Sequence, residues 1–283
     1  MYPCLKNKLL LLSKNKSQVR LTASYFPFYT SKMRPLILIS NDDGYTAKGI
    51  NFLIETLRPY ADLYVMAPDG PRSGGSCAIT SSVPLRYRTI CEEEGLTICA
   101  CSGTPADCIK VALNDAMTRQ PDLVIGGINH GDNSAVNAHY SGTMGVCMEG
   151  AMSGFPSIAF SLDNHSSNAD FTPLKSYIID ITLKVLNEGL PSFTCLNVNF
   201  PNALEFKGVK VCRMGISRWV KETNKCFHPT TKQPYLWLVG NRENQEPEAT
   251  DTDIWALENN YVAVTPVTLD VTDYGLLKKL SFE

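Results

Sequence analysis

Several signatures of common protein classes are absent from this chain of 283 residues. It has only four histidines and no H-E-x-x-H or H-x-x-E-H pattern, which disfavours a histidine-centred active site. No G-x-G-x-x-G sequence occurs, so the fingerprint of dinucleotide-binding proteins is missing. The ten cysteines form no C-x-x-C pair and several stand within apolar runs, which predicts reduced thiols in a cytoplasmic protein.

Strong charge and long apolar runs are also absent. Charged residues make up 19% and hydrophobic residues 44%, so we expect a sizeable buried core. The formal net charge is −2 and the isoelectric point is about 6.1, which provides no basic field for nucleic acid. No stretch reaches the length of a transmembrane helix, so we predict a soluble protein with neither a nucleic-acid nor a membrane partner.

The first acidic residue is Asp42, and the segment before it is basic. Such a segment could be a targeting sequence. Alternatively it is a disordered tail, or the functional start is Met33, just ahead of the first apolar run. We predict that residues 1–32 are a disordered or misassigned leader.

From residue 33 to residue 200, apolar runs alternate with segments of helical periodicity. Runs of branched aliphatic residues predict strands, and apolar residues spaced three or four apart predict helices. This alternation, with short connections, predicts a Rossmann-like three-layer α/β core with a mostly parallel sheet. The predicted strands are 36–39, 63–68, 97–101, 122–125, 156–160 and 195–200, and the predicted helices are 50–57, 104–116, 144–153 and 174–186.

The pattern changes after residue 200. Three further apolar runs, 209–212, 235–239 and 261–264, are separated by long polar loops. We therefore predict a β-rich extension over residues 201–283, which could serve as an arm in oligomerisation.

The first predicted strand ends on two adjacent carboxylates, Asp42 and Asp43, followed by Gly44. In open α/β sheets, ligand sites lie at the carboxyl ends of the strands. Neighbouring aspartates repel each other unless a cation or a proton offsets one charge, and carboxylate oxygens suit Mg²⁺, Mn²⁺ or Ca²⁺. A simple turn is the alternative, since Asp-Gly is a common turn pair. Both interpretations remain open at this point.

Polar residues at other strand ends share the predicted edge with this pair. They are Arg72 and Ser73 after the second strand, Asn129 after a later strand, and the segment Ser141-Gly142-Thr143 at a helix start. Their oxygens could complete a site for a hard divalent cation, and the helix start favours an anion such as phosphate. A cation beside an anion site suits phosphoryl chemistry. The alternatives are a flexible loop for Ser73, a turn for Asn129, and helix capping for Ser141 and Thr143.

A series of motifs, in the same order along the chain from about Met33 into the C-terminal region, closely resembles the SurE family. The motifs are Ser40-Asn41-Asp42-Asp43-Gly44, Ala67-Pro68-Asp69 with Arg72-Ser73, Ser102-Gly103-Thr104-Pro105-Ala106-Asp107-Cys108, Gly127-Ile128-Asn129-His130-Gly131, Tyr140-Ser141-Gly142-Thr143, Glu149-Gly150-Ala151 and Tyr261-Val262-Ala263-Val264-Thr265-Pro266. Members of this family are acid phosphatases that act on nucleoside monophosphates, with a Rossmann-like core and a divalent metal.

The resemblance implies a metal site and an assembly. It places the metal ligands on Asp42, Asp43, Ser73 and Asn129, which would hold one divalent cation per subunit, Mg²⁺ or Mn²⁺. It also implies a homodimer or homotetramer. Where the family often has a proline after the Gly-x-Asn-x-Gly pattern, this chain has Asp132.

We therefore expect a metal-dependent 5'-nucleotidase that hydrolyses nucleoside monophosphates, with 3'-nucleotides and short polyphosphate as further substrates to test. Asp42 and Asp43 are the expected catalytic residues, and Asn129 with Ser141-Gly142-Thr143 would bind the phosphate. A haloacid-dehalogenase-like phosphatase would need D-x-D after the first strand, but position 44 is glycine. A non-catalytic nucleotide-binding module is the other alternative, and the paired carboxylates disfavour it because they would repel phosphate without a metal.

Overall fold

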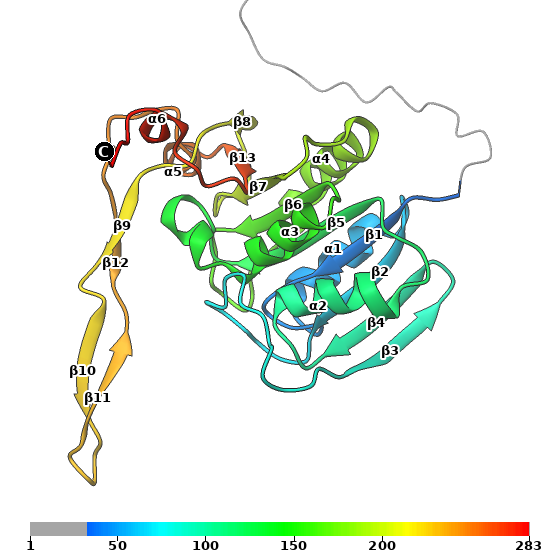
Figure 1. Cartoon of the computed structure of the whole chain (residues 1–283), viewed down its shortest axis with the longest axis horizontal. Helices are drawn as coiled ribbons and strands as arrows, with labels where there is room; N and C mark the ends of the chain where they lie inside the picture. Colours follow the sequence, from blue (N-terminus) through cyan, green and yellow to red (C-terminus); the bar gives the residue numbers. More distant parts are fainter. Residues whose placement is uncertain (1–32, 283) are drawn as a thin grey trace, which may run out of the picture. The chain divides into compact units, whose positions relative to one another are not determined.

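One mixed sheet of nine strands organises the protein. The structure is a computed structural model that describes residues 33–282, so the predicted leader lies outside the described residues. The strand order is β3-β4-β2-β1-β5-β6-β7-β13-β8 (Figure 1). The strands from β4 to β7 in this order run parallel to their neighbours, whereas β3 and β13 pair antiparallel with β4 and β7. The predicted mostly parallel α/β fold is confirmed.

The strands of this sheet are β1 (Leu36–Ser40), β2 (Asp62–Pro68), β3 (Tyr87–Glu93), β4 (Leu96–Cys101), β5 (Leu123–His130), β6 (Ser157–Leu162), β7 (Thr194–Phe200), β8 (Val209–Val211) and β13 (Val262–Thr268). The helices packed on it are α1 (Lys48–Leu57), α2 (Pro105–Val111), α3 (Gly142–Met152) and α4 (Lys175–Glu188).

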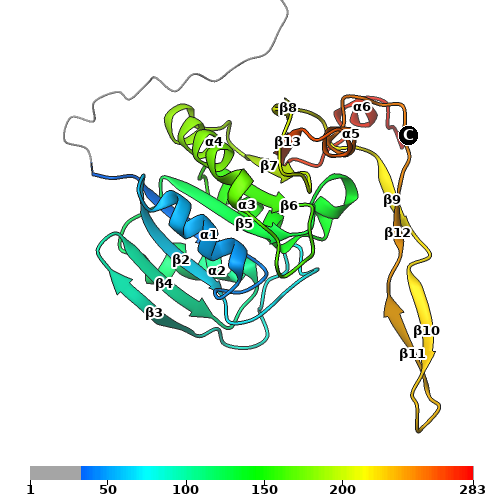
Figure 2. The same ribbon diagram turned by 180° about the vertical axis from the view of Figure 1, so that it is seen from behind.

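Helices cover both faces of this sheet. Figures 1 and 2 show α2 and α3 on one face and α1 and α4 on the other. Along β1, Ile37 and Ile39 pack in the same cluster as α1, whereas Leu38 packs in the cluster that contains α2 and α3. Successive side chains of a strand point to opposite faces, so a run that is apolar at every position is buried between two helical layers.

The strand order reverses direction beside β1. After β1 the chain forms β2, β3 and β4 on one side of β1, and then returns to β5 on the other side. The strands β1 and β5 therefore flank a topological switch point, where open α/β sheets bind their ligands. Their paired register ends at Ser40 and Gly126, so the loop after β1 begins beside the second half of β5.

Three elements of the core differ from the sequence-based expectations. β5 continues past the predicted end at residue 125, with a register shift against β6 between Gly126 and Asn129. β3 was not predicted, because it is an edge strand whose mostly exposed side chains form no apolar run. The helix predicted over 104–116 divides into α2 and a π-helical turn, Ala112–Ala116.

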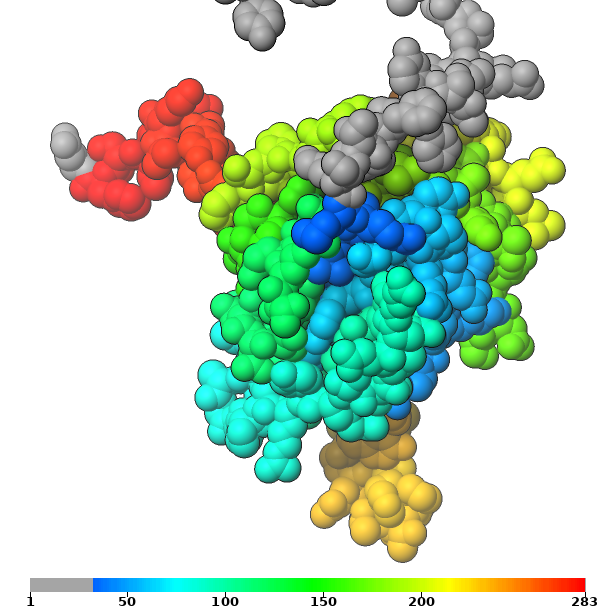
Figure 3. Space-filling view, turned by 90° about the vertical axis from the view of Figure 1, so that its right-hand side faces the viewer, coloured from blue at the N-terminus to red at the C-terminus, as the bar shows by residue number. Residues whose placement is uncertain are grey.

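The chain after residue 200 contributes to the core as well as to an extension. β13 pairs with β7 and β8 pairs with β13, so both extend the central sheet rather than forming only a separate β-rich region. Along the chain, a long hairpin separates β8 from β13. The end of this hairpin projects beyond the core residues (Figures 1 and 3). The hairpin consists of β9 (Ser217–Val220), β10 (Thr223–Phe227), β11 (Pro234–Leu238) and β12 (Asn241–Asn244), and it is followed by the unpredicted helices α5 (Asp253–Glu258) and α6 (Tyr274–Leu277).

Within residues 33–282, no helix combines the length and the apolarity that crossing a bilayer would require.

Gly49 lets α1 lie directly against β5, and this contact can be tested by substitution. A Cβ atom at position 49 would lie 2.0 Å from the carbonyl oxygen of Ile128, which is backbone and cannot rotate away. We expect Gly49→Ala to lower the free energy of unfolding by about 1–3 kcal/mol, because overpacking forces the backbone to move. Gly70→Ala is the matched control, since a Cβ there meets nothing within 4 Å. Equal urea midpoints for the two variants would contradict this packing.

Candidate active site

The loop after β1 is closed by Asn41 and Gly44 rather than by the two aspartates. The Asn41 side chain donates to the carbonyl of Gly44 (3.0 Å) and accepts from its N–H (3.1 Å). Gly44 has a φ of +98°, a conformation that glycine adopts at little cost. The turn therefore needs neither carboxylate, and both Asp42 and Asp43 keep their oxygens for other partners. No pattern in the sequence had indicated this role for Asn41.

Asp42 is fixed by the first residues of α3. Its side chain accepts a hydrogen bond of 2.6 Å from the hydroxyl of Thr143, 101 residues further along the chain. Gly142 lies against the same carboxylate, and a Cβ added at Gly142 would come within 2.7 Å of the Asp42 Cβ. Only 4% of Asp42 is exposed. The start of α3 and the end of β1 are thus joined through one buried carboxylate.

The environment of Asp42 disfavours its ionised form. Burial, and to a smaller extent the neighbouring charge of Asp43, raise the pKa of Asp42 from 3.8 to about 6. Hydrogen bonds from the Thr143 hydroxyl and the Gly142 backbone act in the opposite direction on this pKa. Burial also raises the pKa of Asp43, against the favourable charge of His130 and His165. The pair therefore holds negative charge that the surrounding protein only partly offsets.

The end of β5 lies beside Asp43. The backbone N–H of His130 approaches an oxygen of Asp43 at 3.4 Å, and the Asn129 side chain donates to the carbonyl of Gly131 (2.8 Å). This use of the Asn129 amide nitrogen leaves its amide oxygen as the potential ligand. The ring of His165 lies directly over Gly131, where an added Cβ would come within 2.2 Å of it. No motif of the sequence had indicated His165.

The loop after β2 reaches the site through its backbone. The N–H of Arg72 donates to the carbonyl of Asp42 (2.7 Å), which places the next residue, Ser73, at the same edge. Ser73 is exposed. Among the described residues its hydroxyl has no hydrogen-bond partner. The Arg72 side chain instead binds Asp69 (3.1 Å) and the Ser102 carbonyl (3.3 Å).

The segment Ser141-Gly142-Thr143 makes contacts within the protein at all three positions. The hydroxyl of Ser141 caps α3 by accepting from the Met144 N–H (3.0 Å), as the capping alternative predicts. Gly142 and Thr143 both contact Asp42. A substitution at Gly142 would therefore disturb Asp42 as well as any bound anion, so it cannot separate metal binding from phosphate binding.

The potential metal ligands at this edge suit a hard cation only when the amide oxygen of Asn129 and the hydroxyl of Ser73 are counted with the two carboxylates. In the part of the chain that the structure describes, no three His, Cys, Asp or Glu side chains are grouped to hold a metal ion. Two carboxylates, an amide oxygen and a hydroxyl are nevertheless the all-oxygen ligand type that Mg²⁺ and Mn²⁺ accept. Uncompensated charge on Asp42 and Asp43 is the feature that a divalent cation would relieve.

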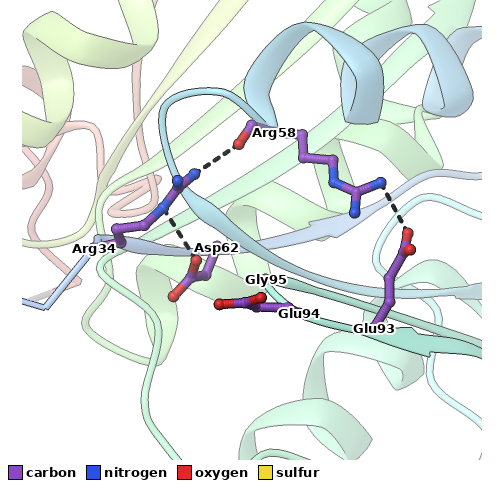
Figure 4. Close-up of a pocket in the computed structure, with 6 residues that line it drawn as sticks. All are labelled: Arg34, Arg58, Asp62, Glu93, Glu94 and Gly95. Atoms are coloured by element: carbon purple, nitrogen blue, oxygen red, sulfur yellow. Dashed lines mark hydrogen bonds and ion pairs between the residues drawn. The ribbon is translucent and has the colours of Figure 1, made fainter.

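A cleft of about 340 Å³ lies at the opposite edge of the sheet and does not contain these residues. Figure 4 shows two ion pairs in its lining, Arg34 with Asp62 (3.2 Å) and Arg58 with Glu93 (2.8 Å). Both ion pairs are largely exposed, and exposed pairs contribute little to stability. We assign no ligand to this cleft.

The bond between Thr143 and Asp42 predicts a pH-dependent effect on stability. Thr143→Val keeps the volume and removes the donor, which should lower the free energy of unfolding by about 1–3 kcal/mol when Asp42 is ionised. Because the folded pKa of Asp42 is about 6 and the unfolded value is 3.8, this cost should be complete above pH 6 to 7. It should shrink as the pH falls and Asp42 takes up a proton.

Thr182→Val provides the matched control for this measurement. Thr182 is fully buried and its hydroxyl has no partner among the described residues, so removing the hydroxyl should be neutral or stabilising. Denaturant unfolding of both variants at pH 8 and pH 5 would decide. A Thr143→Val cost that is equal at both pH values would contradict the assigned role.

Comparisons with known proteins agree with this fold. Residues 37–221 match the family model described as "Survival protein SurE". The chain is 55% identical to the 5'-nucleotidase SurE of Phocaeicola vulgatus over 249 residues, which cover 88% of this chain and 96% of that protein. It is 52% identical to the 5'-nucleotidase SurE of Bacteroides thetaiotaomicron, over 88% of this chain and 95% of that protein.

Structural similarity leads to the same family. The crystal structure of the SurE protein from Aquifex aeolicus superposes with a TM-score of 0.75 at 39% sequence identity, covering 87% of this chain and 98% of that one. Sequence relatives, family model and solved structure all span the segment that carries Asp42, Asp43 and Asn129. The chain belongs to the SurE family.

Proposed function

We propose that this protein is a metal-dependent 5'-nucleotidase that hydrolyses nucleoside 5'-monophosphates to nucleoside and phosphate. The observation that carries the proposal is the pair Asp42 and Asp43 at the switch point, left out of the turn and only partly offset by neighbouring groups. The names of the relatives from P. vulgatus and B. thetaiotaomicron support the same reaction.

The ligand assignment follows from which oxygens remain available. Asp42, Asp43, Asn129 and Ser73 would hold one Mg²⁺ or Mn²⁺ ion. When bound, such an ion would polarise the phosphoryl group and lower the pKa of an attacking water. Asp43 is more exposed than Asp42, so its carboxylate can orient that water and accept its proton.

The start of α3 is the proposed phosphate position. The N-terminal end of a helix carries partial positive charge that favours an anion. Ser141 accepts a hydrogen bond from Met144 and keeps its own hydroxyl hydrogen for a phosphate oxygen. Gly142 and Thr143 hold Asp42 in place beside that anion, so one segment would organise both halves of the site.

Finer assignments belong to the same proposal. Activity on 3'-nucleotides and on short polyphosphate and an acidic pH optimum are expectations carried by the family resemblance, and a cytoplasmic location is expected from the cysteine pattern. A non-catalytic nucleotide-binding module is the competing function, and phosphate release from AMP separates the two.

Removing one carboxylate should abolish turnover without unfolding the protein. We expect AMP hydrolysis with Mn²⁺, loss of activity with EDTA, and recovery on adding Mn²⁺ back. Asp43→Asn should lower kcat roughly a hundredfold or more, because it removes charge from a preorganised site. Asp122→Asn is the control, since Asp122 precedes β5 at the other edge of the sheet. Normal turnover and metal content in Asp43→Asn would contradict the assignment.

The hairpin supports the expectation of a homodimer or homotetramer. Strand β11 of the hairpin exposes the large apolar residues Leu236 (62%), Trp237 (61%) and Leu238 (86%). Exposed apolar residues in a contiguous run are typical of surfaces that contact another protein. Light scattering of the full chain should give two or four times the 31.2 kDa chain mass. A monomer at micromolar concentration would exclude the assembly.

A further inference from the structure

The base of the hairpin contacts the loop that joins the two halves of the candidate site. This loop, residues 131–140, leads from Asn129 at the end of β5 to Ser141 at the start of α3. On β12, Arg242 donates to the carboxylate of Asp132 (2.7 Å) and to the carbonyl and hydroxyl oxygens of Ser134 (3.1 and 3.0 Å). Ser134 in turn donates to Asp132 through its hydroxyl and its backbone N–H.

A second residue of the hairpin reaches the same loop. Trp219 on β9 is the cross-strand partner of Arg242, and its indole N–H donates to the Asn137 side chain (3.0 Å). Behind them, the buried carboxylate of Asp253 accepts from the N–H groups of Ala135 (2.8 Å) and Gly215 (2.8 Å). Ser217, also on β9, accepts from the N–H of Val136 (3.4 Å), so four residues of the C-terminal region bind this loop.

Charge makes the Arg242 contact the decisive one. The Asp132 side chain is only 10% exposed and that of Arg242 22% exposed. Asp163 adds negative charge nearby: burial and then the charge of Asp132 raise its pKa, whereas the charge of Arg242 lowers it. A carboxylate with so little exposure is costly to leave without a cation, so Asp132 would turn towards water if Arg242 were removed.

Such a movement would reach the proposed ligands directly. Asp132 follows Gly131, whose carbonyl accepts the hydrogen bond that orients Asn129. On the other side, Tyr140 precedes Ser141 and donates back to the Asn137 carbonyl (3.0 Å). Asn133 is anchored separately to the sheet through Asn199 (2.7 Å) and Ser161 (2.8 Å), so the loop should shift about this fixed point rather than unfold.

We propose that Arg242 is a positioning residue: by compensating Asp132, it makes the geometry of the candidate active site depend on the C-terminal hairpin. The inference rests on the proposed nucleotidase function for its kinetic test. Arg242 touches neither the proposed metal ligands nor the proposed phosphate position, so its effect must pass through the loop.

The kinetic test compares four variants of the full chain with Mn²⁺ and AMP. Arg242→Ala should lower kcat roughly ten- to a hundredfold with KM changed far less, because misplacement of reacting groups is felt in the transition state. Arg242→Lys should be intermediate, since it keeps the charge but not the planar guanidinium, whose Nη1 makes all three contacts. The double variant Asp132→Asn with Arg242→Ala should recover most of the lost kcat, because no uncompensated carboxylate remains.

Arg218→Ala is the matched control for these variants. Arg218 lies on the same hairpin and pairs with Glu243 at 3.5 Å, but both side chains are at least half exposed. Its kcat should stay within about twofold of the wild type. Thermal melts with midpoints well above the assay temperature establish that each variant is folded in the assay. An Arg242→Ala kcat equal to that of Arg218→Ala, or a loss that Asp132→Asn does not rescue, would overturn the proposal.

Hydrogen exchange separates this inference from the nucleotidase assignment. Amides of residues 131–141 should exchange faster in Arg242→Ala than in the wild type, and return to the wild-type rate in the double variant. Unchanged exchange there would overturn the positioning role. If the wild type hydrolyses no AMP, the proposed function fails, and the exchange result alone decides whether Arg242 holds the loop.

Discussion

Two adjacent carboxylates at the end of a buried strand are the constraint on which the rest of the site depends. β1 is covered on both faces, so it delivers Asp42 and Asp43 to an edge where little water can offset their charge. The protein responds with one hydroxyl, one helix start and backbone N–H groups, which hold the ionised form without neutralising it. A divalent cation would offset the negative charge that these groups leave on the two carboxylates.

The topology explains why this edge collects its residues from distant parts of the chain. β1 and β5 are neighbours because the chain reverses its direction of winding between them. Asn129 and the start of α3 follow β5, so they meet Asp42 and Asp43 although about 90 to 100 residues separate them in sequence. The site is thus a consequence of strand order, and the loops supply its detail.

Local sequence patterns predicted those features that depend on local forces. The aliphatic run 36–39 predicted a strand, and the helix predicted over 104–116 does begin after Thr104, whose side chain forms a capping box with Asp107. The turn closed by Asn41 and Gly44 was harder to predict from the sequence. The same four residues, 41–44, also fit a turn built on the Asp-Gly pair. Ser73, Asn129 and Ser141 as ligands stay predictions that rest on their place at the edge and on the family resemblance.

Long-range contacts could not be predicted from local patterns. The bond between Arg242 and Asp132 spans 110 residues, and neither residue stands in a recognisable motif of its own. The same holds for β13 and β8, whose pairing with the central sheet depends on a return of the chain after the hairpin. Exposed strands such as β3 escape prediction because their side chains follow no apolar alternation.

The most direct test of the central claim is the position of a bound ion. Crystals grown with Mn²⁺ and measured at a wavelength where manganese scatters anomalously should show one strong peak per chain, bonded to oxygens of Asp42 and Asp43 and close to Asn129 and Ser73. A peak at another place, or a crystal that binds Mn²⁺ without contact to Asp42 and Asp43, would contradict the account.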